Sequence, residues 1–486
     1  MIIGRHVKDL RIACPLDAIR TAPGAASGAP VVCCEERCSH PAPDTMRRHH
    51  LTTLVPALAL TPALALAQAP SKSDAEIDRR AHALESKVVA WRRDIHEHPE
   101  LGNREFRTSK LVADHLRKLG IDVRTEVGHT GVVGVLKGGK PGPVVALRAD
   151  MDALPVAEEV DLPFKSVVRA TYNGQDVGVM HACGHDNHVA ILMGVAELLS
   201  GMKSELQGTV KFIFQPAEEG APVGEEGGAE LMLKEGAFDN PKVDAVFGLH
   251  VFPFETGKII YRSGGLMASG DNFKVVIHGR QTHGALPWNG VDPITISSQI
   301  ITSMQSIVSR QVDLTLTPAI VTVGYIRGGV RTNIIPDSVE FGGTIRTFNE
   351  TTRDSIGVRF KRIITALAEA NGARADITLT SGAPVTYNDP ALTARMRPTV
   401  ERILGADNVT TGQQTTTSED FSLFQKAAPG IFIFLGVTPK GTDPAKVAPN
   451  HSPRFFADEA ALVPGVKMLS ALAVDYLAMG GTKPKM

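Results

Sequence analysis

The run MHACGHDNH, at positions 180–188, places three histidines, an aspartate and a thiol close together in the sequence. Cys183 and His185 stand two positions apart, so they cannot share one face of a helix, but an extended loop lets such side chains converge. A thiolate and an imidazole are ligands that suit a borderline metal such as zinc. The run therefore predicts a metal site, with a core cysteine beside loop histidines as the simpler alternative.

Two adjacent carboxylates follow an apolar strand in the run FQPAEEG, at positions 214–220. Neighbouring side chains of extended backbone point in different directions. One carboxylate can therefore bind a metal while the other faces an attacking water, which is the division that metal-assisted hydrolysis needs. The alternative is an acidic turn that is exposed to solvent.

Two further histidines follow predicted strands. His250 closes the short apolar strand 245–249, and His451 lies in the run PNHSP before the last predicted helix. Taken alone, each is read equally well as an ordinary strand-end or loop histidine. Open α/β sheets bind ligands at the carboxyl ends of their strands, where all four segments are expected to lie. Together the four segments supply five candidate ligands and leave Glu218 for another role. Five ligands are too many for one tetrahedral ion and suit two ions. The candidate ligands are Cys183, His185, Glu219, His250 and His451.

The chain resembles a family of dinuclear-metal amidohydrolases and peptidases that includes hippurate hydrolase, indole-acetyl-amino-acid hydrolases, aminoacylases and glutamate carboxypeptidases. The resemblance runs from about residue 76 to the C-terminus and is strongest to the hippurate hydrolase branch, whose bridging ligand is a cysteine. It rests on the segments above and on WRRDIHEHPEL (91–101), RADMDALP (148–155) and TNIIP (332–336). It implies that the five residues named above are the metal ligands and that Glu218 is the general base.

The same resemblance implies roles for residues around the ligand set. Asp150 and Asp152 would orient the ligands from behind. His283 would polarise the scissile carbonyl, and in relatives this histidine comes from a partner subunit. Asn333 and Arg346 would hold the substrate's carboxylate, the guanidinium through two parallel hydrogen bonds. A surface cation on a strand is the alternative for Arg346.

One stretch departs from the pattern of the family. Many relatives have Gly-Gly-His-Ala and a histidine after the proline, whereas Thr282 precedes His283 in this chain and Trp288 follows Pro287. Gln281 is also unusual for the family. The resemblance places these positions beside the substrate. The departure therefore concerns the preference for the acyl group and does not affect the predicted metal ligands.

The elements that must position these residues alternate between strands and helices. Apolar spacing predicts helices at 75–94, 108–119 and 187–199, and strands at 131–136, 144–147, 209–214 and 245–249. This order is typical of an α/β domain with a mixed sheet and helices on both faces. We expect the first part of this catalytic domain at 74–265 and the second part at 383–480, where a helix, a strand and a final helix return.

The segment between these parts has a different pattern. Strand, helix, two strands, helix and strand follow one another from 272 to 379, the order of a ferredoxin-like α+β unit. We therefore expect an inserted domain at 266–382, which the resemblance makes a dimerisation or lid domain.

The N-terminal region looks like an export signal. A basic head at Met46 precedes an apolar stretch, 51–66, and a small-residue cleavage pattern ends at Ala67, so we expect a signal peptide at 46–67 and a periplasmic or secreted protein. Residues 1–45 are expected to be a non-native or disordered extension. Of the five cysteines, only Cys183 would remain after cleavage.

Composition narrows the class of partner. The chain has 486 residues, a formal net charge of -1 and 5% aromatic residues, which argues against a nucleic-acid surface and against an anionic membrane surface. We do not expect a membrane contact after cleavage of the signal.

The hypothesis from sequence is a hydrolase that cleaves the amide bond of N-acyl-amino acids with two divalent ions per subunit. Zinc or manganese is expected, and cobalt or nickel could also occupy such ligands. We expect a homodimer or a higher homo-oligomer. The rival hypotheses are a dipeptidase or carboxypeptidase on the same scaffold and, more remotely, a non-catalytic periplasmic metal-binding protein. Glu218 argues against the last, because metal storage needs no base.

Overall fold

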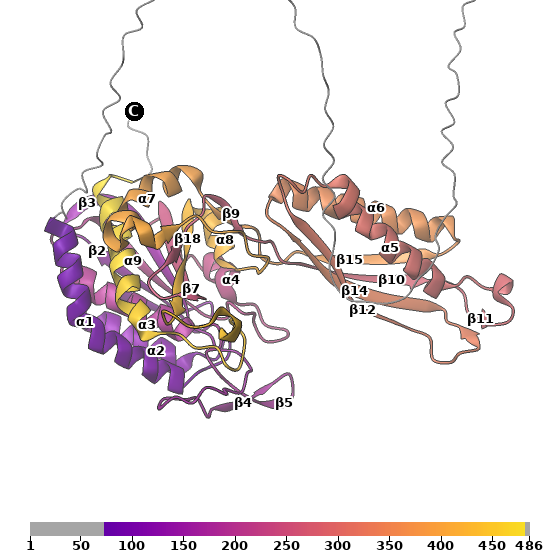
Figure 1. The fold of residues 1–486 in the computed structure, drawn as a ribbon, viewed down its shortest axis with the longest axis horizontal. Coiled ribbons are helices and arrows are strands. Elements are labelled where there is room, and N and C mark those ends of the chain that lie inside the picture. The colour runs from indigo at the N-terminus through magenta and orange to yellow at the C-terminus, as the bar shows by residue number, and fades with distance from the viewer. Residues whose placement is uncertain (1–71, 482–486) are drawn as a thin grey trace, which may run out of the picture. The chain divides into compact units, whose positions relative to one another are not determined.

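The computed structural model describes residues 72–481. The predicted signal peptide, the extension before it and its four cysteines lie outside the described residues. An eight-stranded mixed sheet forms the centre of the larger part (Figure 1). In spatial order its strands are β1 (Asp122–Val127), β2 (Gly131–Lys137), β6 (Gln207–Gln215), β3 (Lys140–Asp150), β7 (Ala245–Glu255), β18 (Gly430–Thr438), β8 (Ile259–Ile260) and β17 (Val409–Thr410).

The four central strands, β6, β3, β7 and β18, run parallel to one another, whereas β2 pairs with β6 and β8 pairs with β18 in antiparallel directions. Their side chains alternate between two apolar cores, as the pleat of a strand requires. In β3, Val145 and Leu147 face one core while Ala146 faces the other. In β18, Ile433 faces the first core and Phe432 the second. A sheet that is buried on both faces explains why these strands are apolar almost throughout.

Helices cover both faces of this sheet. The larger core is covered by α1 (Lys72–Glu97), α2 (Phe106–Lys118), α3 (His185–Ser200), α7 (Pro390–Leu404) and α9 (Leu462–Ala478). The smaller core is covered by α4 (Gly228–Lys234) and α8 (Phe421–Ala427). This arrangement confirms the predicted α/β class.

Short elements complete the larger part. Two small antiparallel pairs are formed by β4 (Arg169–Tyr172) with β5 (Gln175–Gly178), and by β9 (Gly264–Met267) with β16 (Thr386–Asn388). Single 3-10 turns lie at η2 (Ala406–Asn408), η3 (Pro444–Lys446) and η4 (Glu459–Ala461). Because β9 and β16 pair with each other, the chain leaves the larger part and returns to it through adjacent strands.

The inserted segment forms a four-stranded antiparallel sheet with two helices. Its strands are β10 (Asp271–His278), β12 (Ala319–Gly328), β14 (Ser338–Thr347) and β15 (Arg374–Thr380), and its helices are α5 (Pro293–Gln311) and α6 (Glu350–Ala370). The spatial order β12-β14-β10-β15 is that of a ferredoxin-like unit, in agreement with the predicted fold. The two helices begin at the side-chain caps Asp292 and Asn349, whose oxygens accept backbone N–H groups of the first turn. A second small sheet, β11 (Thr282–His283) with β13 (Ile334–Ile335), and the turn η1 (Pro287–Asn289) extend from it.

One strand differs from its predicted length in a way that matters for the site. The apolar run predicts a strand that ends before His250, but β7 continues to Glu255. The reason is its partner: β18 pairs with β7 beyond His250, through Leu435 opposite Val251 and Gly436 opposite Phe252. His250 is therefore held in the middle of a strand.

Among residues 72–481, one helical stretch, Glu459–Ala478, is long and apolar enough to cross a membrane. Its most apolar window is 72% buried inside the fold, because α9 packs against α1, α3 and α7 in the larger core. Burial of this kind is what a core helix shows.

The inserted segment has a hydrophobic core of its own, so its stability can be tested separately. Phe360 on α6 is fully buried, and its ring packs at a tilt against that of Phe273 of β10 with centroids 4.7 Å apart, whereas Val358, two residues earlier, is 67% exposed. We expect Phe360→Ala to lower the free energy of unfolding by about 3–5 kcal/mol, because it leaves a cavity. Val358→Ala, the matched control, should change it by less than about 0.5 kcal/mol. Urea unfolding followed by circular dichroism measures both, and equal effects would contradict the burial of Phe360.

Candidate metal centre

Strand register brings the candidate residues to one end of the sheet. Asp150, the last residue of β3, lies opposite Gln215, the last residue of β6. On the other side of β3, Arg148 pairs with Gly248 of β7, which places His250 level with Asp150. The loop that carries Glu218 and Glu219 follows β6 directly. The carboxyl ends of parallel strands therefore meet here, as expected for a ligand site in an open sheet.

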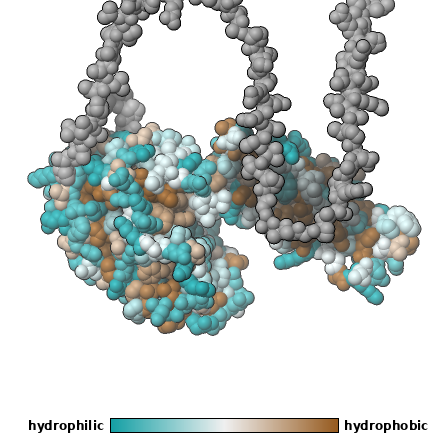
Figure 2. All heavy atoms as spheres, in the orientation of Figure 1, coloured by the Kyte–Doolittle hydropathy of each residue, from teal (hydrophilic) through white to brown (hydrophobic). Residues whose placement is uncertain are grey.

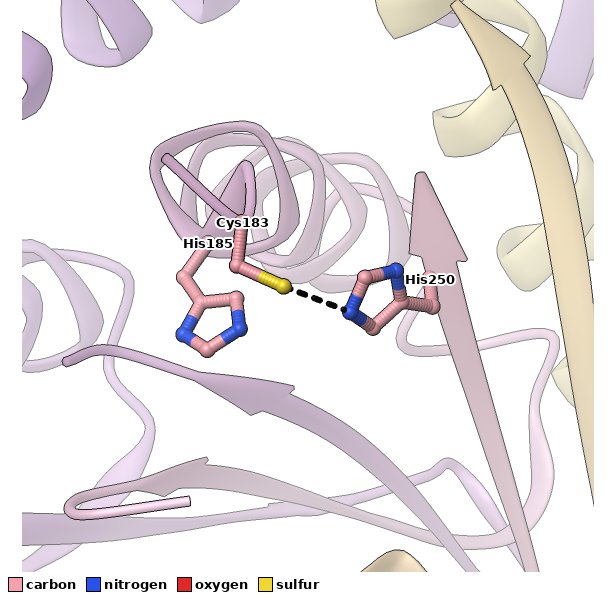
Figure 3. Close-up of side chains that lie close together, drawn as sticks. All are labelled: Cys183, His185 and His250. Carbon is pink, nitrogen blue, oxygen red and sulfur yellow. Dashed lines mark hydrogen bonds between the residues drawn. The ribbon is translucent and has the colours of Figure 1, made fainter. Parts of the chain in front are cut away.

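Cys183 lies in the turn before α3, and His185 is the first residue of that helix. Gly184 between them has a φ of 90°, and a Cβ at this position would lie 2.3 Å from Cγ2 of Val251. Only glycine fits this left-handed turn against β7. Figure 3 shows the result: the Cys183 and His185 side chains descend from the turn toward His250, which projects from β7.

The predicted ligands form two groups that share Cys183. In the first, Cys183, His185 and His250 have potential ligand atoms within 4.8 Å of one another, and in the second Cys183 is joined in the same way by Glu219 and His451. The Cys183 Sγ lies 3.3 Å from Nε2 of His250 and 3.3 Å from Nε2 of His451. Nε2 of His451 is also 2.9 Å from Oε1 of Glu219. Because its sulfur belongs to both groups, Cys183 could serve as a ligand to two ions.

Hydrogen bonds fix which ring nitrogens of His250 and His188 are free. Nδ1 of His250 donates to the carbonyl of Val251 at 2.7 Å, so the lone pair of Nε2 faces Cys183. A ligating histidine is usually oriented in this way by its other nitrogen. His188 is different: its Nε2 accepts from the Val251 amide at 2.8 Å, and its Nδ1 donates to Asp150 at 2.5 Å. His188 therefore has no free nitrogen for a metal and supports the site from behind.

His185 is buried with both ring nitrogens lacking a hydrogen bond. Its Nδ1 is 3.3 Å from Oδ1 of Asp152, and its Nε2 is 3.7 Å from Oδ2 of Asp150. Burial lowers the pKa of His185, but these two carboxylates outweigh it and raise the pKa to about 10. Asp152 also accepts the Glu219 amide at 2.9 Å through Oδ2. It therefore contacts two predicted ligands, which fits its predicted orienting role.

Negative groups outnumber positive ones around the sulfur. Burial, followed by the carboxylates of Glu219, Glu218 and Asp150, raises the pKa of the Cys183 thiol well above its usual range. A cation is needed to hold a thiolate in such surroundings. The excess of carboxylates, the sulfur between two ligand groups and the unpaired nitrogens of His185 all fit a pair of divalent ions.

Glu218 lies beside the ligands: it is in neither group that shares Cys183, but one of its oxygens lies within 4.8 Å of potential ligand atoms of His185 and Glu219. Its Oε2 is 3.9 Å from Nε2 of His185, and its side chain is 8% exposed. Burial raises the pKa of Glu218 well above the usual value, and the neighbouring Glu419 and Glu219 raise it further. A carboxyl group with a raised pKa at the edge of a cavity can take and return a proton.

A buried cluster around Arg148 was missed by the sequence reasoning, although Arg148 is part of a quoted motif. The guanidinium donates to Gln215 at 2.7 Å, to Asp150 at 2.6 Å and to Glu419 at 2.8 Å. Glu419 reaches the site from the turn before α8, and burial raises its pKa to about 7. The run SEDF, at positions 418–421, offered a signal in the sequence. Its two adjacent acids come directly before an apolar helix, much as Glu218 and Glu219 come directly after an apolar strand.

The substrate residues predicted in the inserted segment fall into two places. Arg346 of β14 donates through Nη1 to Oγ of Ser418 at 2.7 Å, and Ser418 lines the cavity at the metal ligands. His283 and Asn333 lie next to each other, because Gly284 donates to the carbonyl of Asn333 at 2.8 Å. Neither lines that cavity. The structure therefore brings Arg346 to Ser418 at the cavity wall, and it places His283 and Asn333 in neighbouring backbone segments elsewhere.

The cavity at the ligands has a volume of about 170 Å³. Beside the ligands, its wall includes the apolar side chains of Phe252 and Met267 and the polar Asn450. Asn450 donates to the carbonyl of Cys183 at 3.0 Å, which ties the His451 loop to the Cys183 turn.

Comparison with known proteins gives a consistent picture. The model of the family described as peptidase family M20/M25/M40 matches residues 146–475. The chain is 41% identical over 396 residues to thermostable carboxypeptidase 1 of Saccharolobus solfataricus, covering 81% of this chain and 96% of that protein. It is 40% identical over 403 residues to the IAA-amino acid hydrolase ILR1-like 2 of Arabidopsis thaliana, covering 82% and 86%.

A solved structure shares the fold. The chain matches a Bacillus subtilis protein described as a dinuclear metal binding peptidase with 35% identity and a TM-score of 0.69, over 82% of this chain and 99% of that one. The description of that protein as dinuclear agrees with the two candidate ligand groups found here, while the identity of the metal stays a prediction.

If Cys183 bridges two ions, one substitution should disturb both. We expect Cys183→Ser to lower bound metal by about half or more, together with activity, since the harder hydroxyl is a poor replacement for a thiolate. Inductively coupled plasma mass spectrometry of the purified protein gives the metal content, and circular dichroism checks the fold. An unchanged metal content would show that Cys183 is only a core thiol.

Proposed function

Because this chain belongs to peptidase family M20/M25/M40, we propose that it hydrolyses the amide bond of N-acyl-amino acids, releasing a carboxylic acid and a free amino acid. The observation that carries the proposal is the pair of ligand groups sharing Cys183, with Glu218 beside them and outside both groups. Storage or transport of a metal would need the ligands but would not need this carboxyl group. The relative that acts on amino acid conjugates supports the substrate class.

Cys183, His185 and His250 would hold one ion, and Cys183, Glu219 and His451 the other. When bound, two divalent ions supply Lewis acidity and lower the pKa of water. Cysteine and histidine ligands favour zinc, manganese is the second expectation, and cobalt or nickel could also bind. Reconstitution of the metal-free protein with each ion, followed by assay, tests the choice.

Glu218 is the proposed general base. Its carboxylate accepts a proton from the attacking water and then donates that proton to the nitrogen of the leaving amine. Arg346, whose Nη1 donates to Ser418 of the cavity wall, would hold the carboxylate of the amino acid. Phe252 and Met267 offer an apolar surface on the same wall.

His283 and Asn333 are proposed to act on the cavity of a partner subunit, His283 polarising the scissile carbonyl and Asn333 binding the substrate carboxylate. Two observations support this: they lie next to each other, and they do not line the cavity of their own chain. The inserted segment also exposes apolar side chains that a subunit contact could cover, including Trp288, Leu316 and Val330 at 74%, 80% and 96% exposure. Brown patches of apolar residues interrupt the polar surface on the visible face (Figure 2). The proposed assembly is a homodimer or higher homo-oligomer.

A carboxypeptidase is the second candidate, because the chain is 41% identical to a protein of that name. A substrate panel separates the two. Benzoyl- and acetyl-amino acids should be cleaved faster than blocked dipeptides under the proposal, and the reverse order would favour the carboxypeptidase. The site of action is proposed to be the periplasm or the exterior, which amino-terminal sequencing of the exported protein, expected to begin at Gln68, would test.

The role of Glu218 can be separated from metal binding. We expect Glu218→Gln to keep both ions and to lose about 10²–10⁴-fold in kcat, because the carboxamide cannot take the proton. Glu226→Gln is the matched control: Glu226 is 69% exposed and pairs with Lys234, so its kcat should stay within about twofold. Steady-state kinetics with metal analysis decide, and retained turnover in Glu218→Gln would rule out the base assignment.

The role of Arg346 depends on the charge of the substrate. Arg346→Met should lower kcat/KM for an N-acyl-amino acid by about 10–100-fold, the value of a hydrogen bond to a charged group. The same variant should hydrolyse the matching N-acyl-amino acid amide about as well as the unmodified protein does. Equal losses on both substrates would show that Arg346 does not bind the carboxylate.

The proposed assembly predicts complementation. Glu218→Gln and His283→Ala proteins should each be nearly inactive, but their mixture, after dissociation and reassociation, should regain up to about a quarter of the activity, since mixed dimers hold one intact site. Analytical ultracentrifugation gives the oligomeric state. If confirmed mixed dimers are fully inactive, His283 acts at the site of its own subunit and the proposal is wrong.

A further inference from the structure

The turn that carries Glu218 is held in an unfavourable backbone conformation. Ala217 has a φ of 50°, in the left-handed region that side chains other than glycine rarely adopt. This conformation costs about 1 kcal/mol or more, so neighbouring contacts must maintain it. Any contact that holds Ala217 also sets the direction of Glu218, the next residue.

One such contact comes from a buried acid that the proposed mechanism leaves without a role. Glu105, just before α2, is fully buried, and its Oε1 accepts the Ala217 amide at 2.9 Å. Its Oε2 accepts a hydrogen bond from Oγ1 of Thr130. Burial, with a contribution from Asp152, raises the pKa of Glu105 to about 8. Burying an acid in such a place lowers the stability of the fold. A role in holding a strained backbone conformation would explain why an acid is nevertheless found there.

Packing and a second acid complete the support of this turn. A Cβ on Gly102 would lie 2.9 Å from the carbonyl oxygen of Gly220, so the segment before Glu105 lies directly against the turn. Asp152 accepts the Glu219 amide at 2.9 Å, as described above. The amides on either side of Glu218 are thus held by two carboxylates that come from different elements.

We propose that Glu105 is a positioning residue: its carboxylate holds the Ala217 amide and thereby aims Glu218 into the metal centre. Glu105 touches neither the ligands nor the cavity wall, so its effect passes through the backbone of residues 216–220. The inference rests on the proposed role of Glu218 as the base.

The test compares three substitutions of Glu105 with a control at Thr130. In Glu105→Ala and Glu105→Asp the Ala217 amide loses its acceptor, and kcat should fall about 10²-fold while KM stays within about threefold. Glu105→Gln retains an oxygen for the Ala217 amide and an NH₂ group for Thr130, so kcat should recover to within about threefold of the unmodified protein. Thr130→Val leaves the contact between Glu105 and the Ala217 amide intact. Its kcat should therefore also stay within about threefold of that of the unmodified protein. Glu105→Asp serves if the alanine variant does not fold.

A second measurement does not depend on turnover. In the metal-free protein, hydrogen exchange measured by mass spectrometry should speed up in the peptide that spans 214–220 for Glu105→Asp and stay unchanged for Glu105→Gln. The proposal is overturned if Glu105→Asp keeps its kcat, if Glu105→Gln loses as much as Glu105→Asp, or if exchange at 214–220 is the same in both. Activity retained by Glu218→Gln would instead overturn the proposed function, whatever Glu105 does.

Discussion

A single buried guanidinium, that of Arg148, joins the elements on which the metal centre stands. It donates to Gln215 at the end of β6, to Asp150 at the end of β3 and to Glu419 before α8, and none of its side chain is exposed. The positive charge keeps Asp150 ionised despite burial, and Asp150 in turn fixes the tautomer of His188. Removing one partner from a buried ion pair leaves the other charge uncompensated, so these acids and this arginine depend on one another.

The same cluster explains why the centre needs cations beyond Arg148. Glu218, Glu219, Asp152 and Glu419 remain around Cys183 with few positive side chains among them. Burial raises the pKa of Glu419 to about 7 and, with the neighbouring carboxylates, raises the pKa of Glu218, because several acids are gathered at one buried edge of the sheet. The chain thus builds a site whose charge balance is completed only by divalent metal, which is a physical reason for ligands as different as thiolate, imidazole and carboxylate to gather at one sheet edge.

Sequence patterns could group the candidate ligands because most of them stand beside a helix or strand with clear apolar periodicity. The helices at 75–94 and 187–199 and the strand at 209–214 are found within a few residues of their predicted bounds, whereas the strand predicted at 245–249 continues to Glu255. The patterns alone assigned no role to Glu105 or Glu419, because their partners are far away in the chain and only the folded sheet brings them together. Two-residue strands such as β8 and β17 carry no periodicity at all. His250 was placed at a strand end because the apolar run stops there, whereas pairing with β18 extends the strand. Nothing in a single sequence says which subunit His283 serves.

The discontinuous larger part has a consequence for how the chain reaches its native state. β7 and β18 are neighbours in the parallel sheet, yet Val246 and its partner Gly430 are separated by roughly 180 residues, which makes their pairing entropically expensive to start. The inserted segment lies between them with its own apolar core and mostly local helix–sheet contacts. If that segment folds first, the pairing of β9 with β16 brings its two ends together. The loop that must close for β7 to pair with β18 is then shorter by the length of the inserted segment. The antiparallel pair β9–β16 would then hold the two ends of the inserted segment together before β7 and β18 pair. The rate at which the metal centre forms would therefore depend on the earlier folding of the inserted segment.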